Sequence, residues 1–240
     1  MPYSVFISDL HLCTDRPAIN QTFFDFLQGP AAQAEALYIL GDLFEYWAGD
    51  DDDDPFDAAV IAALRALADR GVALQLMHGN RDFLISEQFA TASGVRLLPD
   101  PTLIDLYGTP TLLMHGDTLC TDDVEYQKFR TQVRDPAFQQ KFLERPLAAR
   151  KQEIARLRAQ SETSKKAKTE EIMDVAPAAV EAALRRHGYP RLIHGHTHRP
   201  AHHEHIVDGH RCERWVLADW YRHGSYLRCD AGGCTSVNLG

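Results

Sequence analysis

Five short apolar runs, each followed at once by a cluster of Asp, Asn, His and Gly, constrain this chain more than any other feature. The runs are Val5–Ile7, Leu37–Leu40, Leu74–Met77, Leu112–Met114 and Leu192–Ile193. Runs this short and mostly apolar predict buried β-strands, and helix-like stretches such as residues 57–70 separate them. In an open α/β sheet, ligands collect at the carboxyl ends of the strands. We therefore expect all five clusters to converge on one rim.

These clusters supply nitrogen and oxygen donors and no thiolate. The candidate metal ligands are Asp9, His11, Asp42, Asn80, His115, His196 and His198. Imidazole combined with carboxylate and amide oxygens suits Mn²⁺, Fe²⁺ or Zn²⁺. Seven donors exceed what one tetrahedral ion uses, so the set favours a centre of two metal ions over a purely structural histidine cluster.

Residues 122–176 have a different pattern, with apolar side chains recurring at helical spacing among Lys, Arg and Glu and no strand signal. The recurring residues are Tyr126, Phe129, Val133, Phe138, Phe142, Leu147, Ile154 and Leu157. Pro136 and Pro146 predict breaks between helices. Within this region, residues 141–168 carry nine Lys or Arg against three Glu. We expect residues 122–176, called the lid below, to be a helical insertion over the rim of a single domain spanning residues 1–240.

Three smaller features give further expectations. Asp208 and Gly209 predict a hairpin turn, with residues 214–217 and 225–228 as its flanking strands. Residues 50–54 form an acidic run, which we interpret as a solvated loop that caps the following helix. The five cysteines are odd in number and none shows Cys-x-x-Cys spacing, which favours reduced thiols.

Composition restricts the possible partners. The formal net charge of −9 disfavours nucleic acid and, for a uniformly acidic surface, anionic membranes. The beginning of the sequence lacks a signal-peptide pattern, and the longest apolar run, Ala58–Leu64, is far shorter than the ~20 residues of a spanning helix. We expect a cytoplasmic chain with no nucleic-acid partner and no obligate protein partner.

Between residues 4 and 200 the clusters read Asp-x-His, Gly-Asp, Gly-Asn-Arg-Asp, His and Gly-His-x-His, in that order. This order resembles the calcineurin-like metallophosphoesterases. The resemblance implies an α/β fold with a β-sandwich flanked by helices. It also implies two Mn²⁺ ions, with Asp42 bridging them. One ion would be held by Asp9, His11 and His198, and the other by Asn80, His115 and His196.

Arg81 stands where most members of that family have a histidine that protonates the leaving alkoxide. A guanidinium, with a pKa above ~12, cannot act as that acid, although it clamps phosphate well. A reaction without the acid needs a weakly basic leaving group, such as a phosphate monoester with a second pKa of roughly 6. We therefore expect cleavage of a pyrophosphate, with Asp42, Asn80 and Arg81 as catalytic residues. The other interpretation is that Arg81 only packs against Asp82.

Longer motifs around these residues are more specific, among them Gly41–Trp47, His78–Phe83, Ile172–Val175 and His194–Pro200. They resemble the UDP-2,3-diacylglucosamine diphosphatases over nearly the whole chain. That resemblance implies attack of metal-activated water on the α-phosphate of UDP-2,3-diacylglucosamine. The products are UMP and 2,3-diacylglucosamine 1-phosphate, in lipid A biosynthesis at the cytoplasmic face of a Gram-negative inner membrane. Substrate contacts are implied at Asn80, Arg81, Asp123, Ser161, Lys165, Lys168 and His196.

Lys165 departs from the asparagine that relatives commonly have at this position, so its contact with substrate is an open point. A basic, amphipathic lid suits a substrate with a diphosphate head and two acyl chains, and suits contact with an anionic membrane face. Alternatively, its apolar stripe packs on the core as in an ordinary helical hairpin. The rival functions are a cyclic-nucleotide phosphodiesterase, a nuclease, or an inactive membrane-associated binding module.

Overall fold

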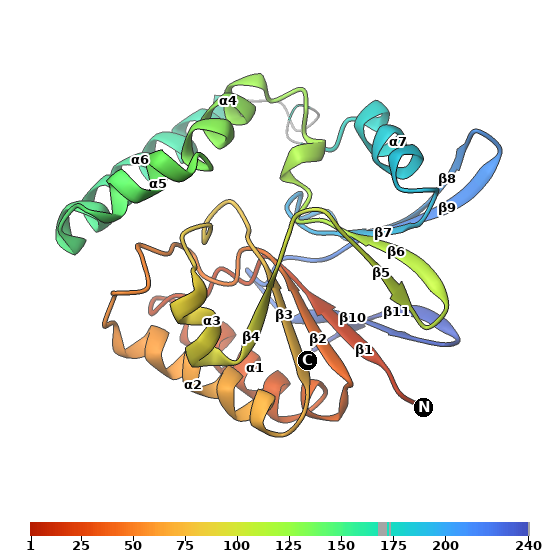
Figure 1. The fold of residues 1–240 in the computed structure, drawn as a ribbon, viewed down its shortest axis with the longest axis horizontal. Helices are drawn as coiled ribbons and strands as arrows, with labels where there is room; N and C mark the ends of the chain where they lie inside the picture. Colours follow the sequence, from red (N-terminus) through yellow and green to blue (C-terminus); the bar gives the residue numbers. More distant parts are fainter. Residues whose placement is uncertain (168–171, 173, 240) are drawn as a thin grey trace.

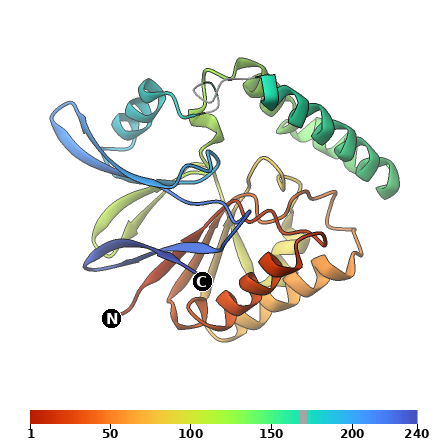
Figure 2. The ribbon, with the colours of Figure 1, turned by 180° about the vertical axis from the view of Figure 1, so that it is seen from behind.

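The computed structural model describes residues 1–167, 172 and 174–239, and it contains two β-sheets with helices on both outer faces (Figures 1 and 2). The first sheet has the strand order β11-β10-β1-β2-β3-β4 and the second has the order β5-β6-β7-β9-β8. The first sheet comprises β1 (Ser4–Ile7), β2 (Ala36–Leu40), β3 (Ala73–Met77), β4 (Val95–Leu98), β10 (Ser225–Asp230) and β11 (Gly233–Asn238). The second comprises β5 (Thr102–Leu106), β6 (Thr109–Leu113), β7 (Arg191–His194), β8 (Ala201–Val207) and β9 (His210–Val216).

Helices cover the outer face of each sheet. The first sheet is covered by α1 (Pro17–Gln28), α2 (Pro55–Asp69) and α3 (Glu87–Ser93), and the second by α7 (Pro177–Arg186) (Figure 1). Two short 3₁₀ turns, Ala31–Gln33 and Asp117–Leu119, complete the body. None of the described helices is long and apolar enough to cross a membrane.

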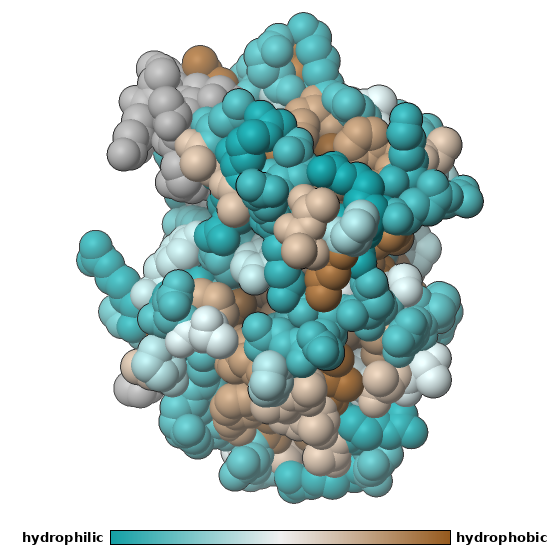
Figure 3. Space-filling view, turned by 90° about the vertical axis from the view of Figure 1, so that its left-hand side faces the viewer, coloured by the Kyte–Doolittle hydropathy of each residue, from teal (hydrophilic) through white to brown (hydrophobic). Residues whose placement is uncertain are grey.

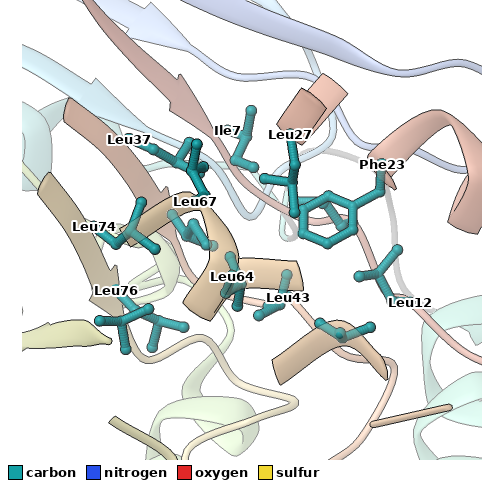
Figure 4. Packing of buried hydrophobic residues seen from close by; sticks show 14 of the residues in the cluster. Ile7, Leu12, Phe23, Leu27, Leu37, Leu43, Leu64, Leu67, Leu74 and Leu76 are labelled. Atoms are coloured by element: carbon teal, nitrogen blue, oxygen red, sulfur yellow. The ribbon is translucent and has the colours of Figure 1, made fainter. Parts of the chain in front are cut away.

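Side-chain alternation along the strands explains why two cores form. On β1, Val5 and Ile7 pack into the cluster shared with α1 and α2, whereas Phe6 packs into the cluster between the two sheets. Figure 4 shows the first cluster, where Leu27 of α1 lies beside Ile7 and Leu67 of α2 lies beside Leu37. A third cluster joins α7 to the second sheet. Strands buried on both faces need continuous apolar runs, as the sequence has.

All five apolar runs form strands, and they are divided between the two sheets of the expected sandwich. The strands β1, β2 and β3 pair in parallel in the first sheet, whereas β6 and β7 pair in parallel in the second. The runs alone do not reveal this division, because strands of either sheet are apolar on both faces. The carboxyl ends of both parallel sets still meet at one rim, because the sheets stack with these strands pointing the same way (Figure 1).

Two expectations for the C-terminal region need correction. Asp208 and Gly209 do form the hairpin turn, both with positive φ, but its strands are β8 and β9. Residues 225–228 belong to β10, which pairs with β1 and β11 in the other sheet. The expectation that all cysteines are reduced was also wrong, since Cys229 and Cys234 form a disulfide. They are opposite each other in the β10–β11 pairing, with Cα atoms 4.1 Å apart.

The lid contains α4 (Val124–Val133), α5 (Pro136–Leu143) and α6 (Leu147–Ala167), and it extends away from the sandwich above the rim (Figure 1). Pro136 begins α5 and Pro146 directly precedes α6, so the predicted breaks are confirmed. Aspartates cap α4 and α5, because Asp123 accepts a hydrogen bond from the Tyr126 amide and Asp135 from the Phe138 amide.

The acidic run attaches the lid to the body. Asp54 caps α2 through the Phe56 amide, as expected. The remainder of the run is not simply solvated, because the Arg150 guanidinium of α6 pairs with Asp51 and the Lys151 ammonium lies 2.7 Å from Asp52. Arg150 is 2% exposed and also donates to the Ala48 carbonyl oxygen. Part of the positive charge of the lid is therefore paired with the acidic loop and attaches the lid to the body.

Candidate metal centre and substrate pocket

Three predicted ligands meet where β1 and β7 end. His11 Nε2 lies 3.4 Å from His198 Nε2, and His198 Nε2 lies 3.4 Å from Asp9 Oδ1. Asp9 Oδ2 accepts hydrogen bonds from the Ser8 hydroxyl and the His196 amide, which fix the carboxylate and aim its other oxygen at the histidines. These groups form the first ligand set that the sequence predicted.

The second set gathers beside it. Asn80 Oδ1 lies 3.1 Å from His115 Nε2 and 2.9 Å from His196 Nδ1. Asp42 stands between the two sets, with Oδ2 3.8 Å from His11 Nε2 and 4.0 Å from His115 Nε2. That position is the one a bridging carboxylate needs. All seven predicted ligands are thus brought together by strand ends from both sheets.

The backbone at these positions is unusual. Five of the seven candidate ligands are non-glycine residues with positive φ, namely Asp9, His11, Asp42, His196 and His198. Such conformations are costly for non-glycine residues and concentrate at functional sites. Gly79 shows how closely the loops approach, because a Cβ atom there would lie 2.0 Å from Asp42 Oδ1 and 2.2 Å from the Asp42 amide nitrogen.

Burial and mutual charge set the protonation of the cluster. Burial lowers the pKa of His11 well below its usual range and that of His196 to about 3, so both imidazoles are neutral at pH 7. Burial raises the pKa of Asp42 to about 7. Burial alone would lower the pKa of His115, but the charges of Asp42 and Asp117 outweigh it and raise this pKa to about 9.

Asp9 behaves differently. Burial opposes its ionisation, yet contact with His198 and the positive charge of His115 hold the pKa of Asp9 well below its usual range. Its Oδ1 is buried and accepts no hydrogen bond from the described residues. An ionised, buried oxygen that faces two imidazole nitrogens is an arrangement that a divalent cation satisfies. The groups Asp9–His11–His198 and Asp9–Asp42–His115 each bring their donor atoms within 4.8 Å of one another. The residues therefore fit divalent metal ions.

A pocket of about 450 Å³ lies between the body and the lid, and the candidate ligand Asn80 is among its lining residues. Its polar end includes Asn80, Arg81, Glu45 and Arg158. Its apolar wall includes seven of the eight residues of the predicted lid stripe, namely Tyr126, Phe129, Val133, Phe138, Phe142, Ile154 and Leu157. The stripe thus lines a cavity between lid and body, and its Phe142 also packs against the first core cluster, so features of both interpretations are present.

The predicted substrate contacts fall into three groups. Asn80, Arg81 and Ser161 line the pocket, and His196 lies in the metal cluster. Asp123 caps α4 and is not among the residues that line the pocket. Lys165 lies in α6, but its side chain is outside the described part of the chain, and Lys168 lies outside the described residues altogether. Their contacts with substrate stay predictions.

The Arg81 side chain lines the pocket. Its amide donates to Asp42 Oδ1 at 2.7 Å, and its side chain is 10% exposed with Nη1 3.9 Å from Glu45 Oε1. Asp82 accepts hydrogen bonds from the backbone amides of Leu43 and Gly79. This aspartate therefore joins the loop of Asp42 to the loop of Asn80.

Sequence reasoning missed several residues around the centre. Tyr221 stacks on the His11 ring at 5.0 Å, with an interplanar angle of 11°, and lies against His198. Asp117 accepts hydrogen bonds from the Tyr126 hydroxyl and from Arg130 Nε, which ties α4 to the strand end that carries His115. Asp117 had a usable signal, since it follows directly in the His-Gly-Asp cluster. Tyr221 had none, because its loop shows no metal-ligand pattern.

The two-sheet sandwich and its rim of Asp, Asn and His define a metallophosphoesterase centre. The family model for the calcineurin-like phosphoesterases matches residues 4–200, and the chain belongs to this family. The predicted fold class and family resemblance are confirmed.

More specific relatives cover almost the whole chain. A protein named UDP-2,3-diacylglucosamine hydrolase from Aromatoleum aromaticum is 64% identical over 230 residues, covering 96% of this chain and 94% of the relative. A protein of the same name from Stenotrophomonas maltophilia is 54% identical over 237 residues, covering 96% of both. Among solved structures, an archaeal phosphodiesterase covers 99% of both chains with a TM-score of 0.50 at 12% identity, which shows the fold alone.

Proposed function

We propose that this chain hydrolyses the pyrophosphate bond of UDP-2,3-diacylglucosamine, giving UMP and 2,3-diacylglucosamine 1-phosphate. The observation that carries the proposal is the joining of two features. Asn80, one of the candidate metal ligands, lines a pocket together with Arg81, and aromatic and aliphatic side chains of the lid line the same pocket. A substrate with a diphosphate at one end and acyl chains at the other matches that division. Relatives that carry the corresponding name support it.

The seven rim residues would hold two divalent ions, for which we propose Mn²⁺, with Asp42 shared between them. Such a pair of ions supplies an activated water nucleophile and neutralises charge on the phosphate oxygens. The chain contributes rigidity. Asp42 is fixed by the Arg81 amide, and the Asp9 carboxylate is fixed by Ser8 and by the His196 amide. These bonds hold the ligands in place before substrate arrives, so little reorganisation accompanies the reaction.

Arg81 and Arg158 would bind the phosphates at the polar end of the pocket. A guanidinium holds phosphate oxygens in a bidentate way and stabilises the charge that grows on the departing sugar phosphate. This leaving group is a weak base and needs no proton donor, which agrees with an arginine at position 81. We propose that water attacks the α-phosphate and that the sugar phosphate leaves toward the apolar end.

A substrate comparison tests this function. The purified chain with Mn²⁺ is given UDP-2,3-diacylglucosamine, UDP-glucosamine without acyl chains, and cyclic AMP. We expect hydrolysis of the diacylated substrate with a kcat/KM at least about 100-fold above that of the other two, because the apolar wall contributes only with acyl chains present. Equal turnover of UDP-glucosamine, or faster turnover of cyclic AMP, contradicts the proposal.

We further propose that the chain acts in the cytoplasm at the anionic face of a membrane. Apolar side chains stand on the lid surface, including Val124 at 55% and Leu143 at 37% exposure, neither of which lines the pocket. Figure 3 faces the end of the molecule that carries the lid helices and shows such hydrophobic side chains among hydrophilic ones. Four basic residues of the lid, namely Arg130, Arg150, Lys151 and Arg158, pair with the body, so we expect only modest electrostatic attraction from those that remain.

Vesicle sedimentation tests the membrane proposal. We expect the chain to sediment with vesicles containing phosphatidylglycerol and to stay in solution with phosphatidylcholine alone. The double variant Val124→Asp/Leu143→Asp should lose this binding, whereas Leu103→Asp, an equally exposed position on β5, should keep it. Absence of binding by the wild-type chain at low salt contradicts the proposal.

A further inference from the structure

Glu45 is a buried carboxylate that contacts both the metal cluster and the lid. It is 8% exposed and follows Asp42 by three residues on the loop after β2. Its Oε2 lies 3.1 Å from Arg16 Nη2 and 3.5 Å from His11 Nδ1. Its Oε1 lies 2.5 Å from Arg158 Nη2, and the backbone amide of Glu45 donates to the Leu12 carbonyl oxygen. The two oxygens therefore serve two different regions.

The contact with His11 has a particular geometry. The ring presents Nε2 to the cluster, 3.8 Å from Asp42 Oδ2 and 3.4 Å from His198 Nε2. Nδ1 on the opposite side of the ring faces Glu45 and has no formed hydrogen bond to the described residues. Histidines that bind metals commonly present their second nitrogen to a carboxylate, which fixes the ring and makes it a better ligand. Glu45 is placed to do this for His11.

The contact with the lid is equally specific. Arg158 of α6 reaches the body through Glu45 Oε1, and Arg81 Nη1 lies 3.9 Å from the same oxygen. Both guanidiniums line the polar end of the pocket. One carboxylate oxygen thus keeps an arginine of the lid beside an arginine of the rim.

We propose that Glu45 is a positioning residue that serves the metal centre through one carboxylate oxygen and the arginines of the pocket through the other. Oε2 orients His11 toward the metal ions, and Oε1 holds Arg158 beside Arg81 where the diphosphate would bind. The role of Arg158 rests on the proposed function, whereas the role toward His11 does not.

The chain offers a matched control for simple attachment of the lid. Asp52 lies in the acidic run of residues 50–54 and pairs at 2.7 Å with Lys151 of α6, the helix that also carries Arg158. None of the contacts described for Asp52 involves the metal cluster or the arginines of the pocket. Asp52→Asn therefore weakens the attachment of the lid and leaves the positioning contacts of Glu45 intact.

The test measures Mn²⁺ affinity, by the EPR signal of free Mn²⁺, together with kcat and KM for UDP-2,3-diacylglucosamine. For Glu45→Gln we expect Mn²⁺ affinity to fall about 10-fold, kcat to fall and KM to rise. Arg158→Met should raise KM and leave Mn²⁺ affinity unchanged. Asp52→Asn should keep the Mn²⁺ affinity and kcat of the wild type. If Glu45→Gln does not fold, Glu45→Asp keeps the charge but reaches less far, and should weaken Mn²⁺ binding as well.

Two results overturn the inference. One is wild-type Mn²⁺ affinity and kcat in the Glu45 variant, and the other is an equal loss in Glu45→Gln and Asp52→Asn, which reduces Glu45 to an attachment of the lid. Hydrolysis of bis-p-nitrophenyl phosphate distinguishes failure of the proposed function from failure of this inference. If the wild type cleaves this ester but not the lipid, and Glu45→Gln still loses Mn²⁺ affinity, the substrate assignment fails while the positioning of His11 stands.

Discussion

The metal-binding rim and the lid differ in how the chain fixes them. At the rim, Asp9, Asp42 and His115 are at most 1% exposed, and backbone amides or carbonyls hold their side chains. In the lid, α5 has no buried residue, and α6 reaches the body through Arg150, Lys151 and Arg158. The rim is therefore fixed before substrate binds, whereas α5 and α6 of the lid depend on a few charged contacts at the edge of an apolar pocket.

This difference separates two tasks. Catalysis of phosphoryl transfer demands fixed positions for charges, which burial and strained backbone provide. Accommodation of two flexible acyl chains demands apolar surface with less exact positions, which a lightly attached helical layer provides. The variants below test this division, beginning with the one that should have the largest effect.

Asp42→Asn removes the charge shared by both ligand sets. We expect turnover to fall by at least about 10³-fold, because neither ion of a two-metal centre is then held in its place. The substitution keeps the volume of the side chain, so the fold should persist. Steady-state kinetics and circular dichroism measure both effects. Wild-type turnover by this variant rules out a two-metal mechanism.

Gly79→Ala tests the crowding of the rim. The new Cβ would displace Asp42, whose Oδ1 and amide nitrogen lie 2.0 and 2.2 Å away, and a shift of this kind costs turnover about 100-fold. Gly71→Ala is the control, because Gly71 has a φ of +91° but nothing within 4 Å of a Cβ. It should lower the free energy of unfolding by about 1 kcal/mol with unchanged kcat. Equal kcat values for the two variants contradict this account of the rim.

Arg150→Met tests the attachment of the lid. Loss of a buried guanidinium that bonds Asp51 and the Ala48 carbonyl should lower the free energy of unfolding by about 2 kcal/mol, measured by urea denaturation. KM should rise, while Mn²⁺ affinity stays the same. Arg156→Met removes an exposed pair with Glu153 on the same helix and should leave the urea midpoint unchanged. A fall in Mn²⁺ affinity in Arg150→Met contradicts the separation of rim from lid.

Asp57→Asn should have the smallest effect and concerns the acidic loop that joins the two regions. Burial, reinforced by Asp54 and Asp52, raises the pKa of Asp57 to about 7. The folded chain keeps a proton between about pH 4 and pH 7 that the unfolded chain releases, so stability falls as pH rises through this window.

Asp57→Asn removes this fall in stability with pH, because asparagine does not titrate. Asp57 is only half-buried and lies in the first turn of α2, where the helix dipole favours a carboxylate. We therefore expect the free energy of unfolding to rise by about 1 kcal/mol at pH 8 and to be unchanged at pH 4. Thermal unfolding across this pH range measures it. A gain at pH 4 equal to that at pH 8 contradicts the titration of Asp57.

The sequence predicts the rim well because its ligands directly follow the strands that position them. His115 and His196 were identified in this way, although their strands lie in the second sheet rather than the first. The positive φ values at Asp9 and Asp42 have no such signal, because non-glycine residues rarely adopt them. Tyr221 also escaped prediction, since it reaches His11 only through the tertiary fold.

The sequence predicts the helices of the lid but not the contacts that attach them to the body. Helical spacing and prolines are local signals, so the stripe and its breaks could be seen in the sequence. The pairing of Arg150 with Asp51 joins residues 99 positions apart, and no periodicity reveals it. The β10–β11 disulfide escaped for the same reason, because strand register decides which cysteines face each other.

Hydrolysis in ¹⁸O-labelled water tests the central claim most directly, which is that the rim activates water against the α-phosphate of a lipid-linked UDP sugar. The chain, Mn²⁺ and UDP-2,3-diacylglucosamine are incubated, and both products are examined by mass spectrometry. We predict label in UMP and none in 2,3-diacylglucosamine 1-phosphate. Label in the sugar phosphate contradicts attack at the α-phosphate. Absence of hydrolysis, with rapid cleavage of bis-p-nitrophenyl phosphate by the same preparation, contradicts the substrate itself.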